Sequence, residues 1–225
     1  MMQKKNQNNL SDMITLSRNE IQKADFYDKL FGVDTSAVLD GQETFDGKLF
    51  YRYQPTNYSF LEYIFKVYPF DDMDHIMDVG FGKGRVLFMA SYMGCNRVSG
   101  CEINEEYFKV TSYNIKEYVS RTKSNTVFTL LNEDAQKIEI DNTINKFFFF
   151  NPFHLKVYVR FFENLMKSLS CFDRKTTIFL YSPLRSTLKY LDKLEIFHLV
   201  EKIDINAEHI LGRLPKLKVR RGRLG

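Results

Sequence analysis

The feature that most constrains this chain is the stretch 75–90, which reads His-Ile-Met-Asp-Val-Gly-Phe-Gly-Lys-Gly-Arg-Val-Leu-Phe-Met-Ala. A short apolar run passes through Gly80, Gly82 and Gly84 and continues with apolar residues at helical spacing. This pattern predicts a strand, a tight glycine turn and a helix. Glycines adopt positive φ and let a ligand lie against the backbone. The helix that follows directs free N–H groups at the turn, so the stretch predicts a site for a nucleotide-like ligand.

Length and composition predict one α/β domain with a small extension, since the chain has 225 residues of which 44% are apolar. The net charge of +4 permits an acidic or nucleic-acid partner without requiring one. Cys95, Cys101 and Cys171 form no CxxC pair, which predicts a reducing compartment and no metal site. No apolar run approaches the ~20 residues of a membrane span, and the polar N-terminus lacks the apolar core of a signal peptide. We therefore expect a cytoplasmic protein.

Strand-like and helix-like patterns alternate along the chain. After the glycine turn we expect strands at 97–103, 126–131, 144–150 and 176–181, helices at 105–119, 157–169 and 183–191, and a closing hairpin of 193–203 with 208–211. Helices are also expected at 21–31 and 58–68. This order predicts an α/β fold with a doubly wound, mostly parallel seven-stranded sheet, helices on both faces and an N-terminal helical extension. Four consecutive phenylalanines, 147–150, indicate a central strand buried on both faces.

Four segments follow from this pattern. We expect a disordered polar N-terminus at 1–20, a helical or lid segment at 21–70, the main domain at 71–212 and a basic tail at 213–225. The tail is either a solvated end or a guide that leads a nucleic acid or an acidic protein to the site.

Polar residues fall at the carboxyl ends of four expected strands. Asp78 to Gly84, Glu102, Asp134 and Asn151 occupy these ends. In doubly wound sheets ligands bind beyond the carboxyl ends of the strands, near the point where the strand order reverses. The sequence therefore predicts that these residues converge on one site.

The glycine spacing resembles motif I of class I S-adenosylmethionine-dependent methyltransferases. The NAD fingerprint G-x-G-x-x-G does not fit, because Arg85 stands where its third glycine belongs. The chain instead has D-x-G-x-G-x-G, beginning at Asp78. The resemblance implies a Rossmann-like methyltransferase fold and S-adenosyl-L-methionine as cofactor. It also implies that Glu102 binds the ribose hydroxyls and that Asp134, with Glu133 as the fallback, binds the adenine amino group.

A further likeness concerns Tyr-Gln-Pro-Thr-Asn-Tyr-Ser at 53–59. Together with the glycine motif, this segment looks like a bacterial group that is distantly similar to non-SET lysine methyltransferases. The analogy implies that Tyr53, Gln54, Pro55 and Thr56 contact the methionine end of the cofactor. The full set of expected cofactor residues is Tyr53, Gln54, Thr56, Asp78, Gly80, Phe81, Gly82, Gly84, Glu102, Ile103, Asp134, Ala135 and Asn151.

The expected catalytic residues are Asn151, Pro152 and Phe153, which resemble a shortened form of the Asn-Pro-Pro-Tyr/Phe motif of amino-methylating enzymes. The Asn151 carboxamide would accept hydrogen bonds from a target amine, and Phe153 would stack on a planar target or line a lysine channel. The alternative is that Asn-Pro is only a turn after a strand. His154 is a second candidate for proton transfer.

Other side chains near the motif have simpler interpretations. Lys83 and Arg85 are expected to be solvated or helix-surface charges. His75 is expected to be a surface or hydrogen-bonded structural residue. Phe81 replaces the small residue usual between the first two glycines, and we expect it to pack beside the cofactor.

The resulting hypothesis is S-adenosylmethionine-dependent methyl transfer to nitrogen, with protein lysine as the first acceptor. Nucleic-acid or small-molecule methylation is one alternative, and a non-catalytic binding protein with the same fold is another. The sequence leaves the acceptor, the methylated atom and the oligomeric state open.

Overall fold

The computed structural model describes residues 19–36, 44–45, 48–49, 53–150, 154–203 and 217–222. Within these ranges, seven strands form one sheet in the order β5-β4-β3-β6-β7-β9-β8. The first five strands of this order are parallel, whereas β9 is antiparallel to both β7 and β8. This is the α/β, mostly parallel sheet that the alternating pattern predicted.

The elements follow the expected order closely. The sheet domain consists of β3 (His75–Val79), α3 (Arg85–Tyr92), β4 (Arg97–Cys101), α4 (Glu105–Thr122), β5 (Val127–Leu131), β6 (Lys146–Phe150), α5 (Leu155–Cys171), β7 (Thr176–Tyr181), α6 (Arg185–Lys193), β8 (Phe197–Ile203) and β9 (Leu217–Gly222). It is preceded by a helix at 19–31, a short pair β1 (Thr44–Phe45) and β2 (Lys48–Leu49), and α2 (Tyr58–Val67). The expected helices at 21–31 and 58–68 are thus confirmed.

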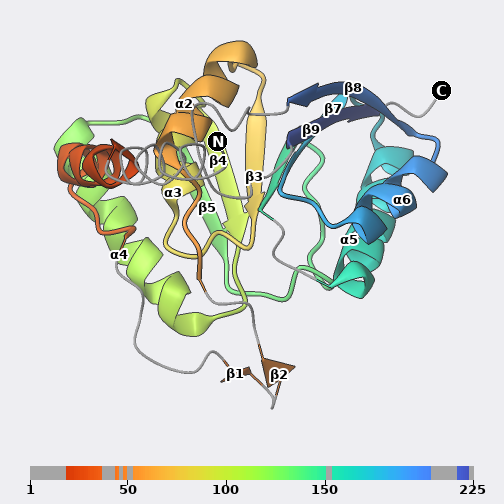
Figure 1. The fold of residues 1–225 in the computed structure, drawn as a ribbon, viewed down its shortest axis with the longest axis horizontal. Coiled ribbons are helices and arrows are strands. Elements are labelled where there is room, and N and C mark those ends of the chain that lie inside the picture. Colours follow the sequence, from red (N-terminus) through yellow and green to blue (C-terminus); the bar gives the residue numbers. More distant parts are fainter. Residues whose placement is uncertain are drawn as a thin grey trace, which may run out of the picture.

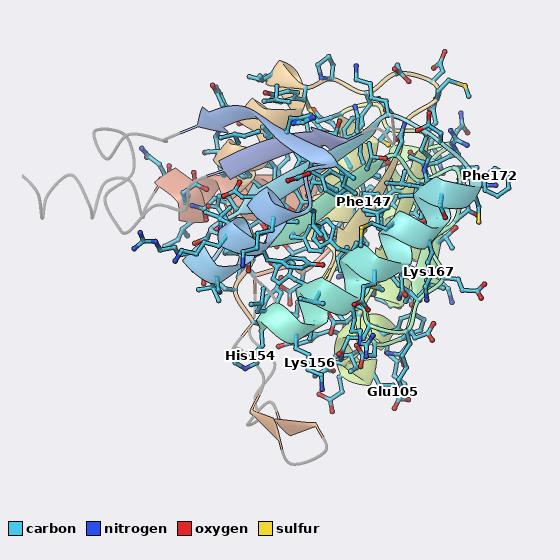
Figure 2. The ribbon with its side chains drawn as sticks, turned by 90° about the vertical axis from the view of Figure 1, so that its right-hand side faces the viewer. Glu105, Phe147, His154, Lys156, Lys167 and Phe172 are labelled. Atoms are coloured by element: carbon cyan, nitrogen blue, oxygen red, sulfur yellow. The ribbon has the colours of Figure 1, made fainter. Side chains whose placement is uncertain are left out.

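Helices cover both faces of the sheet, with α2, α3 and α4 on one side and α5 and α6 on the other (Figure 1). The phenylalanine run on β6 supplies both layers, because side chains of a strand alternate between its faces. Phe148 packs in the α2–α4 layer, while Phe147 and Phe149 pack in the α5–α6 layer. All three are 0% exposed. The prediction of a central strand buried on both faces is confirmed, and Figure 2 shows Phe147 between the sheet and α5.

The N-terminal helix at 19–31 packs on the α2–α4 layer. Its Tyr27 and Phe31 rings lie 4.7 and 6.2 Å from the Tyr58 ring, between ring centroids, and Phe31 also contacts Tyr118 of α4. Lys23 and Tyr27 both bond to the Glu62 carboxylate of α2. These contacts make the helix part of the core and bring the residues that follow it toward the glycine turn.

The C-terminal strands differ from expectation. The expected hairpin paired 193–203 with 208–211, but β8 pairs with β9 at 217–222, and residues 208–211 lie outside the described ranges. Residues 217–222, which were expected in the basic tail, form β9 instead, and this strand lies between β7 and β8. The sequence Leu-Lys-Val-Arg-Arg-Gly lacks the continuous apolar run by which the central strands were recognised.

None of the helices in the part of the chain that the structure describes has the length and apolarity that a bilayer span requires.

Candidate functional site

The glycine turn follows β3 directly and lies at the carboxyl edge of the sheet. Gly80, Gly82 and Gly84 have φ of +84°, +53° and +84°. The Gly80 N–H donates to the carbonyl oxygen of Cys101 over 2.8 Å, which attaches the turn to the end of β4. The predicted strand, glycine turn and helix are confirmed as β3, residues 80–84 and α3.

Two of the glycines lie where a side chain would collide with neighbours. A Cβ on Gly84 would lie 2.7 Å from Cγ2 of Thr111, and a Cβ on Gly82 would lie 2.5 Å from the Tyr53 ring. The Thr111 hydroxyl also donates to the Gly82 carbonyl oxygen over 2.8 Å. The turn is therefore held between α4 and Tyr53, with its backbone in van der Waals contact with both.

Phe81 turns away from the backbone face of the turn and enters the core. Its side chain is 4% exposed, and a Cβ on Gly100 of β4 would lie only 2.6 Å from its Cδ1 atom. The glycine at position 100 thus makes the space for this ring, which also lies 6.5 Å from Phe108. This packing leaves the backbone of Phe81, rather than its ring, for contact with a ligand.

Glu102 is the first residue after β4, and its carboxylate bridges two neighbouring segments. One oxygen accepts from the Gly82 N–H and the other from the Asn104 N–H, each over 2.9 Å. Asn132, just after β5, donates to the Glu102 carbonyl oxygen over 2.8 Å and lies 3.4 Å from that of Ile103. An ionised carboxylate is an acceptor of hydrogen bonds only. A ligand that carries hydroxyl groups would suit the carboxylate that holds the turn.

Asp78, the fourth residue of β3, is 4% exposed. Burial raises the pKa of this carboxyl well above its usual range, and the negative charge of Glu102 raises it further. A cationic group placed beside Asp78 would stabilise its ionised form. The arrangement suits a ligand that carries an ammonium or another positive charge.

Asp134 and Ala135 begin a turn after β5. The Asp134 carboxylate accepts from the N–H of Gln136 over 2.9 Å and from its side-chain amide over 3.0 Å. Ala135 is buried in the α5–α6 core layer. Gln136 was not among the predicted site residues, although an Asp side chain commonly bonds to the backbone N–H two positions later.

The segment before α2 lies against the glycine turn, as its expected contact with a ligand requires. The Tyr53 hydroxyl donates to the Thr35 carbonyl oxygen over 2.8 Å, and its ring is 5.1 Å from the Tyr107 ring of α4. Burial raises the pKa of the Tyr53 phenol above its usual value. Thr56 is buried, whereas Gln54 is exposed.

Expecting Lys83 and Arg85 to be surface charges was wrong. Their side chains are 2% and 6% exposed. Lys83 lies 3.3 Å from the Asp34 carboxylate, and Arg85 donates three hydrogen bonds to residues 35, 36 and 56. All four partner residues lie far away in sequence, so no local pattern indicated them.

The expected catalytic residues Asn151, Pro152 and Phe153 lie outside the described residues. They directly follow Phe150, the last residue of β6, and β6 is the neighbour of β3 in the sheet. His154 is exposed at the N-cap of α5, where Figure 2 shows it together with Lys156.

His75 is a structural residue, as one of its two interpretations predicted. It is 8% exposed, and its ring nitrogens lie 2.8 Å from the Thr143 hydroxyl and 2.7 Å from the Ser99 hydroxyl. Burial, with a smaller effect of Arg97, lowers its pKa to about 4. Within the described ranges, no group of three or more His, Cys, Asp or Glu side chains is placed to hold a metal ion.

A family model described as "Histone methylation protein DOT1" matches residues 42–141. No curated protein matches the chain. Among solved structures it is similar to an RNA methyltransferase from Salinibacter ruber in complex with S-adenosyl-L-homocysteine, at 15% identity and a TM-score of 0.55, covering 76% of this chain and 93% of that one. It is also similar to an S-adenosylmethionine-dependent O-methyltransferase from Thermotoga maritima, at 14% identity and a TM-score of 0.56, covering 77% of this chain and 68% of that one. A third similar structure is a ribosomal protein L11 methylase from Lactobacillus delbrueckii subsp. bulgaricus, at 13% identity and a TM-score of 0.53. The match covers 74% of this chain and 78% of that one.

These likenesses show the fold, which is that of class I methyltransferases. Two of these structures are named for different acceptors, RNA and ribosomal protein L11, and the third is named only for methylation at oxygen. The fold therefore leaves the acceptor of this chain open.

Proposed function

We propose that this methyltransferase transfers the methyl group of S-adenosylmethionine to a nitrogen atom of its acceptor, with the lysine side chain of a protein as the first candidate. The observation that carries the proposal is the glycine turn with the Asp78, Glu102 and Asp134 carboxylates around it, which come from the ends of three neighbouring strands. The match to a family model described as a histone methylation protein supports a protein as the acceptor.

The residues present fit this cofactor. Gly82 and Gly84 keep the turn compact, because a Cβ at Gly82 would collide with the Tyr53 ring and one at Gly84 with Thr111. Glu102 would hold the ribose hydroxyls, since an ionised carboxylate is a strong acceptor and the Gly82 and Asn104 N–H groups orient this one. Asp78 would balance the ammonium, and Asp134 would accept from the adenine amino group.

The cofactor supplies a methyl group on a sulfonium, which is displaced in line by a nucleophile. This chain's own residues therefore have to align the acceptor and exclude water. Asn151 remains our candidate for orienting the acceptor amine through its carboxamide oxygen, and Phe153 for lining its path. His154, which begins the next helix, is a candidate for taking up the proton of the amine.

The test is incubation of the protein and host lysate with methyl-labelled cofactor. We expect the label in the protein fraction and, after digestion, on lysine. Label found in nucleic acid or in small molecules would show that the acceptor belongs to that class and is not a protein. If calorimetry detected no cofactor binding at high micromolar concentration, the enzyme proposal would be wrong and a non-catalytic binding protein would be favoured. The variant Glu102→Ala is the control, because labelling that depends on this site should fall when Glu102 is removed.

A further inference from the structure

A buried hydrogen-bond network joins residues 28–36 to the glycine turn, and Thr35 is its centre. Thr35 is 0% exposed. Its backbone N–H and its hydroxyl both donate to the Asp28 carboxylate, over 2.8 and 2.6 Å. The same hydroxyl oxygen accepts from Arg85 Nε over 2.9 Å, and its carbonyl oxygen accepts from the Tyr53 hydroxyl. One residue thus links the N-terminal helix, the helix after the turn and the ring above the turn.

Arg85 holds the network from the side of α3. Its guanidinium donates to the hydroxyls of Thr35 and Ser36, over 2.9 Å each, and to the Thr56 carbonyl oxygen over 3.1 Å. It also lies 4.5 Å above the centre of the Tyr58 ring. A buried guanidinium with three acceptors and an aromatic face fixes its neighbours more strongly than a solvated charge does. Arg85 therefore fastens residues 35, 36 and 56 to the first residue of α3.

Lys83 adds a second attachment from within the turn itself. Its buried ammonium group lies 3.3 Å from the Asp34 carboxylate, and Asn114 of α4 donates to the Asp34 carbonyl oxygen over 3.2 Å. Residues 34–36 are thus attached to the turn, to α3 and to α4. We call residues 34–36 the strap.

The strap determines where the Tyr53 ring lies. The hydroxyl bond to Thr35 fixes one end of the ring, and Tyr107 packs against it. The ring then lies so close to the turn that a Cβ on Gly82 would be 2.5 Å from it. Movement of the strap would therefore move the wall that faces the backbone of Gly82.

We infer that Arg85 and Thr35 are positioning residues for the cofactor, which hold Tyr53 over the glycine turn and so slow the escape of the bound molecule. The inference rests on the proposed function, because it assumes that S-adenosylmethionine binds at the turn. Arg85 and Thr35 act through Tyr53 and Thr56 and need not touch the cofactor. Substituting Arg85 or Thr35 should therefore change the affinity and the dissociation rate of the cofactor, but not the rate of methyl transfer.

The experiment measures binding of S-adenosylhomocysteine to the full chain by calorimetry and its dissociation rate by stopped flow. Arg85→Lys keeps the charge but loses the fork of three bonds, and we expect affinity to fall about tenfold or more through faster dissociation. Tyr53→Phe keeps the ring but removes the hydroxyl that bonds to Thr35, and we expect a loss of roughly three- to tenfold. Arg160→Lys is the matched control, because Arg160 is an exposed side chain of α5 paired with Glu163.

A second readout separates positioning from a structural role. Hydrogen exchange is followed in peptides that cover 28–36 and 80–85. In the wild type we expect bound S-adenosylhomocysteine to slow exchange in both peptides. In Arg85→Lys it should slow exchange only in the peptide that covers 80–85. A structural role would instead lower the thermal midpoint of Arg85→Lys equally with and without ligand.

The outcomes are distinguishable. If the wild type does not bind S-adenosylhomocysteine, the proposed function and this inference both fail. If the wild type binds and both Arg85→Lys and Tyr53→Phe bind as tightly as Arg160→Lys, the inference alone is overturned. Weaker binding in both variants, with loss of protection confined to 28–36, supports it.

Discussion

Glu102 lies between two backbone N–H groups, one from the glycine turn and one from the start of α4. We expect Glu102→Ala to weaken cofactor binding by about 1.5–3 kcal/mol, because charge-assisted bonds to a ligand and to the turn are both lost. Calorimetry with S-adenosylhomocysteine measures this. Glu106→Ala is the matched control, since Glu106 is exposed on the first turn of α4. Unchanged affinity in Glu102→Ala would remove Glu102 from the ribose role.

Gly82 offers a test of how closely Tyr53 faces the turn. We expect Gly82→Ala to lower the free energy of unfolding by more than Gly94→Ala does. Both glycines have positive φ, so each change costs about 1–2 kcal/mol of backbone energy. A Cβ at Gly94 meets nothing within 4 Å, whereas one at Gly82 meets the Tyr53 ring. Urea unfolding of the two variants measures the difference, and equal losses would show that the ring moves aside without cost.

These residues also show what the sequence could indicate about the site. The positions of Asp78 on β3 and of Glu102 beside the turn could be predicted because both stand at fixed places relative to the glycine motif. Arg85 and Lys83 were misjudged because a charge after a glycine turn is usually solvated, and their partners near residue 35 are about 50 positions away. Burial of a charge depends on such distant partners, which no local pattern shows.

At the scale of elements, the apolar strands were the most predictable. The strand expected at 176–181 is β7, residue for residue, because a run of buried β-formers has clear limits. Helices α4 and α5 extend two or three residues beyond the expected ends, where polar final turns conceal the boundary. Strand β9 was missed because its pairing with β7 and β8 is a property of the sheet rather than of its own composition.

The corner after β6 carries a prediction about the acceptor. We expect Asn151→Ala to lower turnover more than it lowers cofactor affinity, because the carboxamide is proposed to orient the acceptor amine. Turnover with labelled cofactor, combined with calorimetry, gives the two quantities separately. Asn96→Ala serves as the control, since Asn96 is exposed before β4, at the opposite edge of the sheet, and donates to the Asp72 carboxylate. An equal loss of turnover and affinity, or no loss of either, would indicate that Asn151 is only a turn residue.

At the scale of the whole molecule, the edge of the sheet opposite the site is tied together by buried polar groups. Lys146 on β6 forms an ion pair with Asp74 over 2.6 Å, and Asn145 also bonds to Asp74 over 3.2 Å. His75 joins β4 to the segment before β6 through Ser99 and Thr143. The two edges of one sheet thus differ, since the carboxylates that we propose for cofactor binding lie at one edge and bonds that fix the strands lie at the other.

His75 makes the stability of this domain depend on pH. Its pKa of about 4 in the folded protein is below the ordinary value of 6.5 because of burial. The unfolded chain therefore binds the proton first as the pH falls from about 6.5 to about 4. The contribution of His75 to the free energy of unfolding is therefore complete above about pH 6.5 and is lost as the pH falls from about 6.5 to about 4. Asp78 acts in the opposite sense, because a buried carboxyl with a raised pKa takes up its proton in the folded state.

The contribution of His75 is isolated by comparing two proteins at two pH values. We expect the wild type to lose on the order of 1 kcal/mol more than His75→Gln between pH 7 and pH 5.5, by urea unfolding. Gln keeps a donor and an acceptor for Ser99 and Thr143 but does not titrate. The contribution of Asp78 is common to both proteins and cancels in the difference. An identical pH dependence in the two proteins would mean that the buried imidazole is protonated as readily in the folded chain as in the unfolded one.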